Sequence, residues 1–431
     1  MMVSCFMKKT GIIVVFIFIA YTVSFASDEC IKTLVNNVDD SYSNLSDECI
    51  MKLKELIVKG KDNDQKIQAL QILKKSKVRT NIEFFKDILY SVRSITVQQM
   101  VIEILAEMHD KKVLPVIIEF LPSPFFAVRE SVILALKKNG DDRMYPYIIR
   151  LARSDEVIHR IYALEALYHL YDNRFYEIIV RLLQDTNKSV RYFALDCVVH
   201  NEISAALPYV RSIASGDENE EVRVKAINVL SALHDRAAYY IFVRALSDYS
   251  DLVRDAAVDA LSTLLSKEST IYLSRQLLTE REVYIKRKII KALITAKNAG
   301  DIRGLQHIVH NEENRSLRMY AVYALGVIRD KRTVPLIIES LDDEDFRIRA
   351  EAAAALSQFK GKNVVIPLLE SYSKENEMYV KTAIVFSLKK ICDMGSLQKL
   401  FIIYTQEQDI VLKMILSSAI QHIITRNTRQ Y

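Results

Sequence analysis

The chain has 431 residues, half of them hydrophobic, and carries a formal charge of only +5 at neutral pH. So small a net charge is evidence against a nucleic-acid partner, because phosphate backbones usually call for a concentrated basic surface. Nine glycines, seven prolines and no tryptophan in this length favour an almost wholly helical protein.

Residues 1–26 have the pattern of a secretory signal peptide. Lys8 and Lys9 precede an apolar run from Gly11 to Tyr21, and small residues occupy the two positions, ending at Ala26, that a signal peptidase reads. We expect cleavage at about Ala26, which leaves a chain of charge +3 with no membrane span, outside the cytoplasm and either periplasmic or secreted. The alternative is a retained anchor, although about 16 apolar residues are fewer than the ~20 that span a bilayer.

Residues 27–45 are expected to form an N-terminal cap, which covers the first apolar face of a repeat array. The phrase Ser-Asp-Glu-Cys-Ile occurs twice, around Cys30 and around Cys49. In an oxidising compartment these two cysteines could form a disulfide or could both stay free. Cys197 and Cys392 fall within or near the end of predicted helices, and we predict that both are packed thiols.

A fixed period organises residues 46–425. One residue, usually aliphatic and followed by Lys or Arg in eleven of twelve copies, recurs about every 31 residues, and we name it the anchor of its repeat. Small and apolar residues follow at offsets of four, seven and eight, which share one helical face. A period of this length predicts a solenoid of stacked helix pairs, with residues 426–431 as a polar tail. The anchors are Gln65, Val97, Val128, His159, Val190, Val222, Val253, Ile285, Leu317, Ile348, Val380 and Leu412.

Each repeat is expected to contain a first helix, a polar loop and a second helix. Prolines precede five anchors at a nearly constant spacing, where a proline is tolerated only in the first turn of the first helix. The cation after each anchor either belongs to a stripe that binds polyanions or pairs with the acidic loop of its own or a neighbouring repeat. We favour the pairing, because acidic residues recur in step with the basic ones. The five prolines are Pro115, Pro146, Pro208, Pro335 and Pro367.

These features resemble HEAT repeats, in particular the short type found in the phycobilisome lyase group, whose repeat length is similar to the period of this chain. The resemblance rests on the first-helix proline, the Val-Arg phrase at the anchor and the alanines that follow it. It covers nearly all of residues 46–425. The resemblance implies an all-α fold, a right-handed α-solenoid of about twelve HEAT-like repeats, with first helices on the convex side and second helices on the concave side.

Two types of enzyme use such repeats, and neither matches this chain. Deoxyhypusine hydroxylase carries His-Glu dipeptides, but no histidine here is followed by glutamate. The dipeptides His109-Asp110 and His234-Asp235 come nearest, and they fit helix ends, where a histidine complements the helix dipole. Bilin lyases act on cytoplasmic proteins, which disagrees with a secretion signal.

A metal site is the other chemistry to consider. His307 and His310 have metal-ligand spacing with Glu313 nearby, but a pair of half-exposed histidines at a helix end is the simpler interpretation. The chain has no glycine-rich phosphate loop, no Gly-x-Ser-x-Gly elbow and no Cys-x-x-Cys pair. We therefore predict no catalytic residue, no metal and no cofactor.

Recognition is the remaining function, and helical geometry predicts where it occurs. Offsets two, six and nine of each second helix point away from the buried offsets. Aromatic, methionine and alanine residues recur there in four consecutive repeats, next to a basic pair, which predicts an apolar groove beside a charged step. The alternative is that these side chains pack on adjacent repeats. The predicted partner-binding residues are Arg287, Lys291, Met319, Tyr323 and Phe386, and the same offsets also hold Tyr168, Tyr192, Asp255, Asp259, Ala350, Ala354 and Met414.

The sequence as a whole predicts a non-enzymatic extracytoplasmic scaffold for protein interactions. It would bind a protein or peptide segment along its concave face, preferably an amphipathic segment with acidic residues at one end. The chain would be a monomer or part of an envelope complex. Two alternatives stay open: a lyase-like or metal-dependent HEAT-repeat enzyme, and a surface adhesin that binds glycan or a host protein.

Overall fold

The computed structural model of the chain describes residues 45–75, 82–108, 110–139, 142–264, 266–298 and 300–428. The predicted signal peptide, nearly all of the predicted N-terminal cap and Cys30 lie outside the described residues. None of the described helices combines the length and the hydrophobicity that a bilayer span requires.

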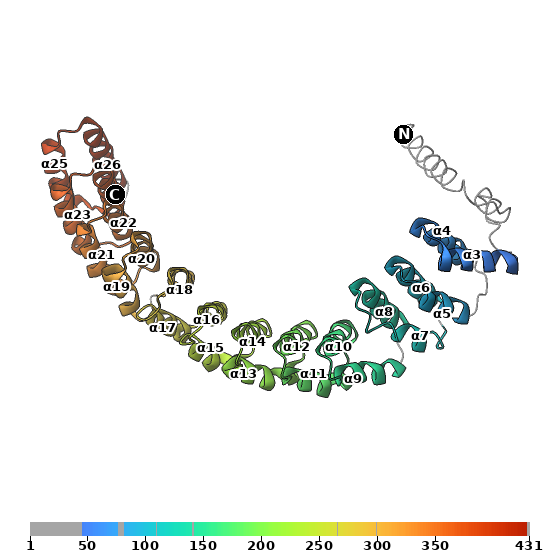
Figure 1. The fold of residues 1–431 in the computed structure, drawn as a ribbon. Helices are drawn as coiled ribbons and strands as arrows, with labels where there is room; N and C mark the ends of the chain where they lie inside the picture. Colours follow the sequence, from blue (N-terminus) through green and yellow to red (C-terminus); the bar gives the residue numbers. More distant parts are fainter. Residues whose placement is uncertain are drawn as a thin grey trace, which may run out of the picture. The chain divides into compact units, whose positions relative to one another are not determined.

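The described residues form α-helices and short 3-10 turns, and they contain no strand. Twelve helix pairs follow one another along the chain (Figure 1), which confirms the predicted all-α solenoid. The pairs are α3 (Asp47–Lys59) with α4 (Asn63–Lys75), α5 (Ile82–Ser91) with α6 (Ile95–Glu107), α7 (Leu114–Ile118) with α8 (Phe126–Asn139), α9 (Tyr145–Ala152) with α10 (Val157–Leu170), α11 (Tyr176–Leu183) with α12 (Lys188–His200), α13 (Leu207–Gly216) with α14 (Glu220–Ala232), α15 (Tyr239–Ala245) with α16 (Asp251–Leu264), α17 (Lys267–Gln276) with α18 (Val283–Ala296), α19 (Ile302–Asn311) with α20 (Arg315–Ile328), α21 (Val334–Glu339) with α22 (Phe346–Leu356), α23 (Lys362–Lys374) with α24 (Met378–Ile391), and α25 (Leu397–Gln406) with α26 (Ile410–Thr428).

The anchors set the register of the second helices. In all twelve pairs the anchor is the third residue of the second helix, and ten of the twelve anchors are buried. The exceptions are Gln65 and His159, which are half-buried. The residue three positions before an anchor is the N-cap, and the side chains of Asn187, Asn219 and Asn314 accept a backbone N–H there. The period that was evident in the sequence is therefore a period of helix starts.

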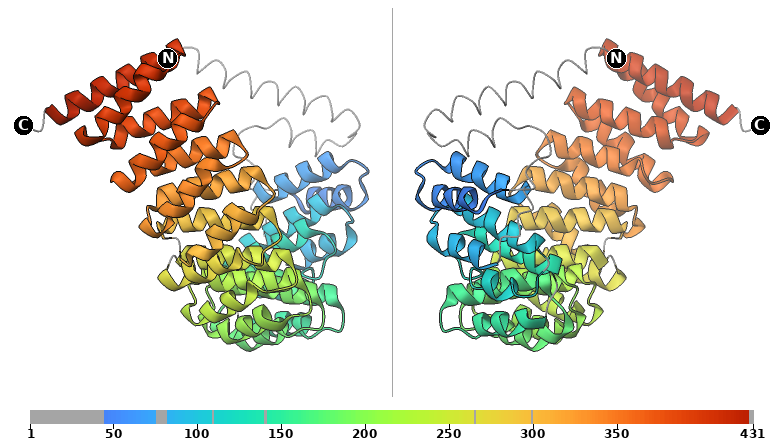
Figure 2. Two further views of the ribbon diagram at one scale, coloured as in Figure 1. Left: turned by 90° about the vertical axis from the view of Figure 1, so that its left-hand side faces the viewer. Right: turned by 90° about the vertical axis from the view of Figure 1, so that its right-hand side faces the viewer.

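The chain divides into two compact units, Met1–Asn201 and Glu202–Tyr431, here called the N-terminal and C-terminal units. Within each unit the second helices contact one another in succession and form an inner row, while the first helices form an outer row (Figure 1). Figure 2 shows the helices of the last repeats of the C-terminal unit stacked roughly parallel, layer on layer. The inner row of each unit is thus the surface that the second helices present.

Four of the five prolines lie in the first turn of a first helix, as predicted, and the fifth does not. Pro115, Pro146, Pro208 and Pro335 lie at the first or second position of α7, α9, α13 and α21. Pro367 lies inside α23, which begins at Lys362. In that repeat the turn before the proline is part of the α-helix, whereas a separate 3-10 turn precedes α21. Only one helical turn precedes Pro367, so its missing N–H removes a single bond near the helix start.

The C-terminal end also differs from the prediction of a polar tail at residues 426–431. Helix α26 continues to Thr428, and Arg426 donates hydrogen bonds to the backbone carbonyls of Lys389, Lys390 and Cys392 at the end of α24. The last carbonyls of a helix have no partner within it, so a guanidinium that reaches them acts as a C-cap. Arg426 is part of the last repeat for this reason.

The cysteines within the described residues are all buried, and the first described helix has a side-chain cap. The Ser46 hydroxyl accepts the Cys49 backbone N–H at 3.3 Å and caps α3. Cys49 is disulfide-bonded, whereas Cys30, whose pairing with Cys49 the sequence left open, lies outside the described residues. Cys197 and Cys392 are free and buried, which confirms that they are packed thiols, and burial raises the pKa of both.

Candidate functional site

The cations that follow the anchors form ion pairs within the repeat array. In seven repeats the cation pairs with a carboxylate in the loop of the next repeat, at 2.5 to 3.4 Å. The arginines also donate to a carbonyl six positions before them. This ladder confirms the predicted pairing and neutralises most of the basic stripe. The pairs are Arg160–Asp185, Arg223–Asp248, Arg254–Glu280, Lys286–Glu312, Arg318–Asp343, Arg349–Glu375 and Lys381–Glu407.

Fewer positions of the second helices are exposed to solvent than the sequence predicted. At offset six, ten of the twelve residues are exposed, and they include Tyr323 at 45% and Phe386 at 56%. At offset two, Met319 is half-buried and Ala350 is buried, so the prediction that Ala350 faces solvent was wrong. The reason is that α20 and α22 each contact a second helix on both sides, which leaves a strip centred on offset six free.

The structure brings two of the five predicted partner-binding residues together. Arg287 and Lys291 line a shallow hollow of about 530 Å³ along α18, together with Arg281, Glu282, Val283, Tyr284 and Lys288. Lys288 is engaged by two carboxylates of α16, at 2.6 and 2.8 Å, whereas Arg287 is exposed. Besides Lys288, the lining has three cations against the single carboxylate of Glu282, so the hollow has an excess of positive charge. Met319, Tyr323 and Phe386 do not line it.

Tyr320 connects this hollow to the apolar strip, and the offset rule missed it. The Arg287 guanidinium lies 5.7 Å from the Tyr320 ring centroid, and the Tyr320 ring lies stacked beside that of Tyr323 at 6.1 Å. Burial raises the pKa of Tyr320. Phe386 lies on α24, two second helices beyond Tyr323, with the exposed Ala354 on the helix between. An i, i+3 aromatic pair was the sequence signal that could have identified Tyr320.

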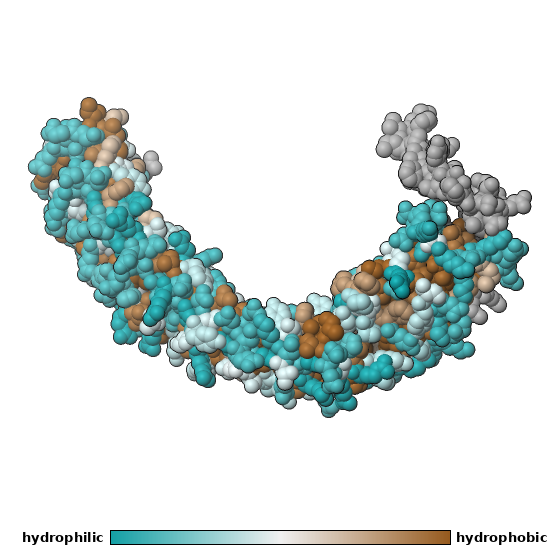
Figure 3. All heavy atoms as spheres, in the orientation of Figure 1, coloured by the Kyte–Doolittle hydropathy of each residue, from teal (hydrophilic) through white to brown (hydrophobic). Residues whose placement is uncertain are grey.

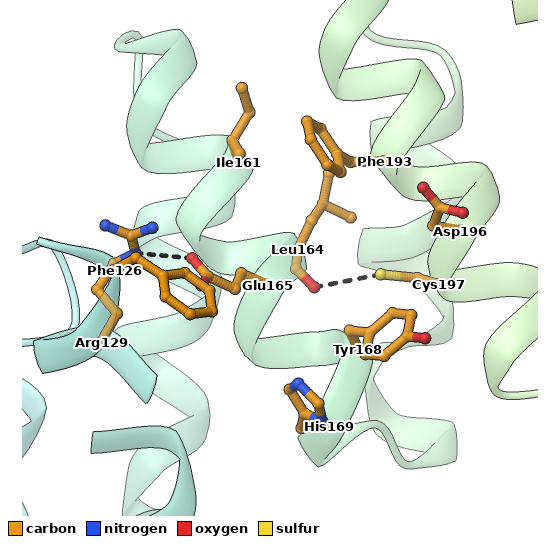
Figure 4. A pocket seen from close by; sticks show the side chains of 10 residues that line it. All are labelled: Phe126, Arg129, Ile161, Leu164, Glu165, Tyr168, His169, Phe193, Asp196 and Cys197. Carbon is orange, nitrogen blue, oxygen red and sulfur yellow. Dashed lines mark hydrogen bonds and ion pairs between the residues drawn. The ribbon is translucent and has the colours of Figure 1, made fainter. Parts of the chain in front are cut away.

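The N-terminal unit contains a deeper pocket, which the sequence identified only through Tyr168. It has a volume of about 480 Å³ and lies between three consecutive second helices, α8, α10 and α12. In Figure 4, Phe126 and Arg129 come from α8 and Phe193 and Asp196 from α12, with α10 between them. Brown spheres gather over this part of the unit in Figure 3. The lining residues are Phe126, Arg129, Ile161, Leu164, Glu165, Tyr168, His169, Phe193, Asp196 and Cys197.

The pocket lies where the cation ladder begins, next to Arg129 and before the Arg160–Asp185 pair. In the seven pairs of the ladder the carboxylate stands two positions before the N-cap of the second helix. The loops before α6, α8 and α10 have no carboxylate at that position, which holds Val92, Ser123 and Ser154. The Ser154 hydroxyl accepts the Glu156 backbone N–H at 3.2 Å. Arg129 instead pairs through Nε with Glu165 Oε2 at 2.7 Å (Figure 4), and its guanidinium lies 4.0 Å from the centroid of the Tyr162 ring. Glu165 Oε1 is buried and has no hydrogen-bond partner among the described residues, so one acceptor in the wall of the pocket is left without a donor.

Glu165 and Asp196 both stand at offset six, and they are the two residues at that offset which are half-buried and not exposed. Sequence reasoning considered this offset but did not select either residue, because it gave weight to aromatic side chains. Tyr168 stacks on His200 with ring centroids 3.7 Å apart, and Cys197 Sγ donates to the Leu164 carbonyl at 3.2 Å. Tyr192 is exposed beside the pocket and does not line it.

Nothing in the described ranges groups three His, Cys, Asp or Glu side chains so that they could hold a metal ion. His310 Nε2 lies 3.0 Å from Glu339 Oε2, and His307 Nδ1 lies 3.2 Å from the side-chain amide of Asn311. These two histidines thus meet different partners. The hollow along α18 and the pocket between α8, α10 and α12 offer a concave shape, apolar area and charged groups. These are the features through which a protein binds another molecule.

A family model described as HEAT repeats matches residues 82–168, 207–294 and 302–389. No curated protein matches the chain. Among solved structures, the karyopherin Kap121p bound to the extreme C-terminus of the protein phosphatase Cdc14p is 13% identical, with a TM-score of 0.54, and the match covers 98% of this chain and 55% of that one.

Two further structures of the same karyopherin are similar. Kap121p bound to Nup53p is 14% identical, with a TM-score of 0.52, and 94% of this chain and 53% of that chain are covered. Kap121p bound to RanGTP is 15% identical, with a TM-score of 0.51, and 95% and 52% are covered. This chain therefore spans about half the length of the solved structures it matches. At identities this low, the TM-scores above 0.5 show a common fold and nothing more.

Proposed function

Because the chain belongs to the HEAT-repeat family, we propose that it is a non-enzymatic scaffold outside the cytoplasm, which holds a protein or peptide segment on the inner surface of its second helices. The short period of the anchors supports our proposal that these are short HEAT repeats of the phycobilisome lyase type, without the lyase activity.

One observation carries this proposal: large apolar side chains are exposed at offset six beside a cationic hollow in the C-terminal unit. Tyr323 and Phe386 are 45% and 56% exposed, and Arg287 and Lys291 line the hollow. A solvated helix face is normally polar, so exposed aromatic residues in a row favour a binding surface. A segment with acidic residues at one end and apolar residues further on complements both parts. Two of the similar karyopherin structures hold a bound protein, Cdc14p in one and Nup53p in the other.

The test is a pull-down from native envelope extract, with each recovered protein quantified by mass spectrometry. The double variant Tyr323→Ala with Phe386→Ala is expected to lose a specific partner, because buried aromatic residues often contribute about 2 kcal/mol or more each at an interface. The matched control is Tyr240→Ala with Phe401→Ala, a tyrosine and a phenylalanine exposed on first helices of the same unit. Equal recovery by wild type and both double variants contradicts this location of the site.

The proposed compartment needs a separate measurement. Alkaline phosphatase, which is active only where its disulfides form, is fused after the first repeat, and activity is expected with residues 1–26 present and lost when they are deleted. The mass of the secreted fusion should place the cleavage at about Ala26. Activity that does not depend on residues 1–26 would contradict export by this signal.

Metal analysis distinguishes the scaffold from a metal-dependent enzyme. The purified protein is expected to contain no stoichiometric metal. Iron or zinc bound at one equivalent or more per chain would overturn the non-enzymatic proposal, because structural and catalytic metals both remain bound during purification when their ligands are complete.

A further inference from the structure

We propose that the pocket between α8, α10 and α12 binds a tyrosine or tryptophan side chain of a protein segment, that is, an aromatic ring with an uncharged polar tip. This inference rests on the proposed function as a scaffold for protein segments. It adds a second site, in the N-terminal unit, which differs from the hollow along α18 because it selects an aromatic ring and not a charge.

The walls of the pocket provide the first argument. Phe126 of α8 and Phe193 of α12 are 60% and 44% exposed, and α10 lies between them (Figure 4). Ile161 and Leu164 of α10 complete the apolar lining. Aromatic rings pack well against such walls, edge to face or offset. A volume of about 480 Å³ lies within the range of roughly 300–1,000 Å³ of pockets that hold small organic molecules, so a phenol or an indole ring fits.

The charged side chains of the lining are engaged within the protein. Arg129 pairs with Glu165 at 2.7 Å, and Asp196 also has an interaction partner in the chain. A lysine, an arginine or a carboxylate that entered the pocket would lose its hydration without meeting an unpaired charge of the opposite sign, which is unfavourable. The charges of the lining therefore favour an uncharged occupant.

Two uncharged polar side chains in the lining favour an occupant with a polar tip. Tyr168 and His169 contact other aromatic rings, and the side chain of neither makes a hydrogen bond to another described residue. A phenolic hydroxyl and a neutral imidazole can each donate and accept a hydrogen bond. A leucine or phenylalanine side chain would cover these groups without bonding to them, whereas a tyrosine O–H or a tryptophan N–H supplies a partner.

The probe for the test is a random peptide display library, selected on the full mature chain, and the enriched peptides are expected to share a tyrosine or a tryptophan. Because this chain has no tryptophan, the fluorescence of a tryptophan peptide comes from its own indole, and its emission should shift to shorter wavelength when the ring enters the pocket. The variant Phe193→Ala removes one wall and should weaken the Kd by about tenfold or more, as loss of an aromatic hot spot does. The control is Phe401→Ala, at a phenylalanine that is 45% exposed on the first helix α25, and it should leave the Kd unchanged.

A second pair of changes tests the polar tip. Replacing the peptide's tyrosine by phenylalanine, or its tryptophan by naphthylalanine, should weaken binding to wild type by about fivefold, the effect of one lost hydrogen bond. The same replacement should have no effect with the double variant Tyr168→Phe and His169→Leu, because the protein partners are already absent. Tyr168→Phe keeps the ring that stacks on His200, and thermal melting of each variant establishes that it is folded. The control is Tyr240→Phe with His422→Leu, at exposed residues of the C-terminal unit.

Three results would overturn the inference: enriched peptides without tyrosine or tryptophan, a Kd that Phe193→Ala does not change, or an equal Kd for a tyrosine peptide and its phenylalanine counterpart. Peptides that lose binding with Tyr323→Ala and Phe386→Ala, but not with Phe193→Ala, would leave the scaffold function standing and reject this pocket alone. A wild-type chain that enriches no peptide contradicts both proposals.

Discussion

The Tyr372 hydroxyl donates a hydrogen bond of 2.6 Å to Glu407 Oε2, in the loop of the next repeat. Lys381, the cation after its anchor, lies 3.3 Å from the same oxygen. Tyr372 comes from α23, Lys381 from α24 and Glu407 from the loop before α26. One carboxylate therefore joins two successive repeats through a neutral and a charged donor.

This carboxylate should make the C-terminal repeats sensitive to acid. Burial alone would raise the pKa of Glu407, but hydrogen bonds from Tyr372, the Asp409 backbone and Lys381 outweigh it and lower the pKa to about 2. A carboxylate with a lower pKa in the folded state stabilises the fold fully above about pH 5 and loses that contribution as the pH falls from about 4.5 towards 2. The melting temperature of wild type minus that of Glu407→Gln is expected to be positive at pH 7 and to shrink over this range.

The control for this prediction is Glu370→Gln, at an exposed glutamate of α23, which should give no pH-dependent difference. A constant difference between wild type and Glu407→Gln from pH 7 to about pH 3 would show that the ionised carboxylate does not contribute.

The register of the second helices predicts which alanines tolerate a charge. Ala257 is fully buried at offset four of its repeat, so Ala257→Asp places a carboxylate without a partner between helices and should destabilise the protein by several kcal/mol, on the order of 3. Ala354 is exposed at offset six, and Ala354→Asp should change stability by less than about 0.5 kcal/mol. Urea unfolding followed by circular dichroism measures both. Similar midpoints for the two variants would contradict the register.

Two glycines should respond differently when each is replaced by alanine, because only one of them lies in a close helix contact. A Cβ on Gly326 would lie 2.7 Å from the Cα and Cβ of Ala355, so Gly326→Ala forces the helices apart and should cost about 1–3 kcal/mol. Gly216, the last residue of α13, has no atom within 4 Å of the Cβ position. Gly216→Ala is expected to be neutral or to stabilise by up to about 1 kcal/mol. Thermal melts of the two variants should shift in opposite directions or differ by several degrees.

The free thiols should react only after unfolding. Burial raises the pKa of the Cys197 thiol, and burial raises that of Cys392 to about 11, so neither forms the reactive thiolate readily. Ellman's reagent at about pH 8 is expected to detect no fast-reacting thiol in the native mature chain and both thiols in guanidinium chloride. The variant Ser418→Cys, at an exposed position, should add one fast thiol. Rapid reaction of the native wild type would contradict the burial of these residues.

The tertiary structure decided where neighbouring helices leave room. The sequence placed Tyr168 on the inner face but gave no sign that Glu165, Asp196 and Phe193 meet around a pocket, because the side chains that line it come from three repeats. It also did not show that Arg129 pairs with Glu165 on the next second helix, or that Tyr320 links Arg287 to Tyr323. Such contacts depend on the distance and angle between adjacent helices, which a period does not contain.

The sequence by itself determined the array and its register. Val253 and the other anchors are the third residues of their helices, and Ala257 is buried as the offsets required, because helix starts and buried faces depend on local spacing that each repeat carries. Features that depend on more than this local pattern could not be predicted from the sequence. Ala350 is buried and Pro367 lies inside α23, since burial and helix length also depend on the repeats on either side. Exposure, pockets and the choice of ion-pair partner are properties of neighbouring repeats packed together, and only the tertiary structure supplies them.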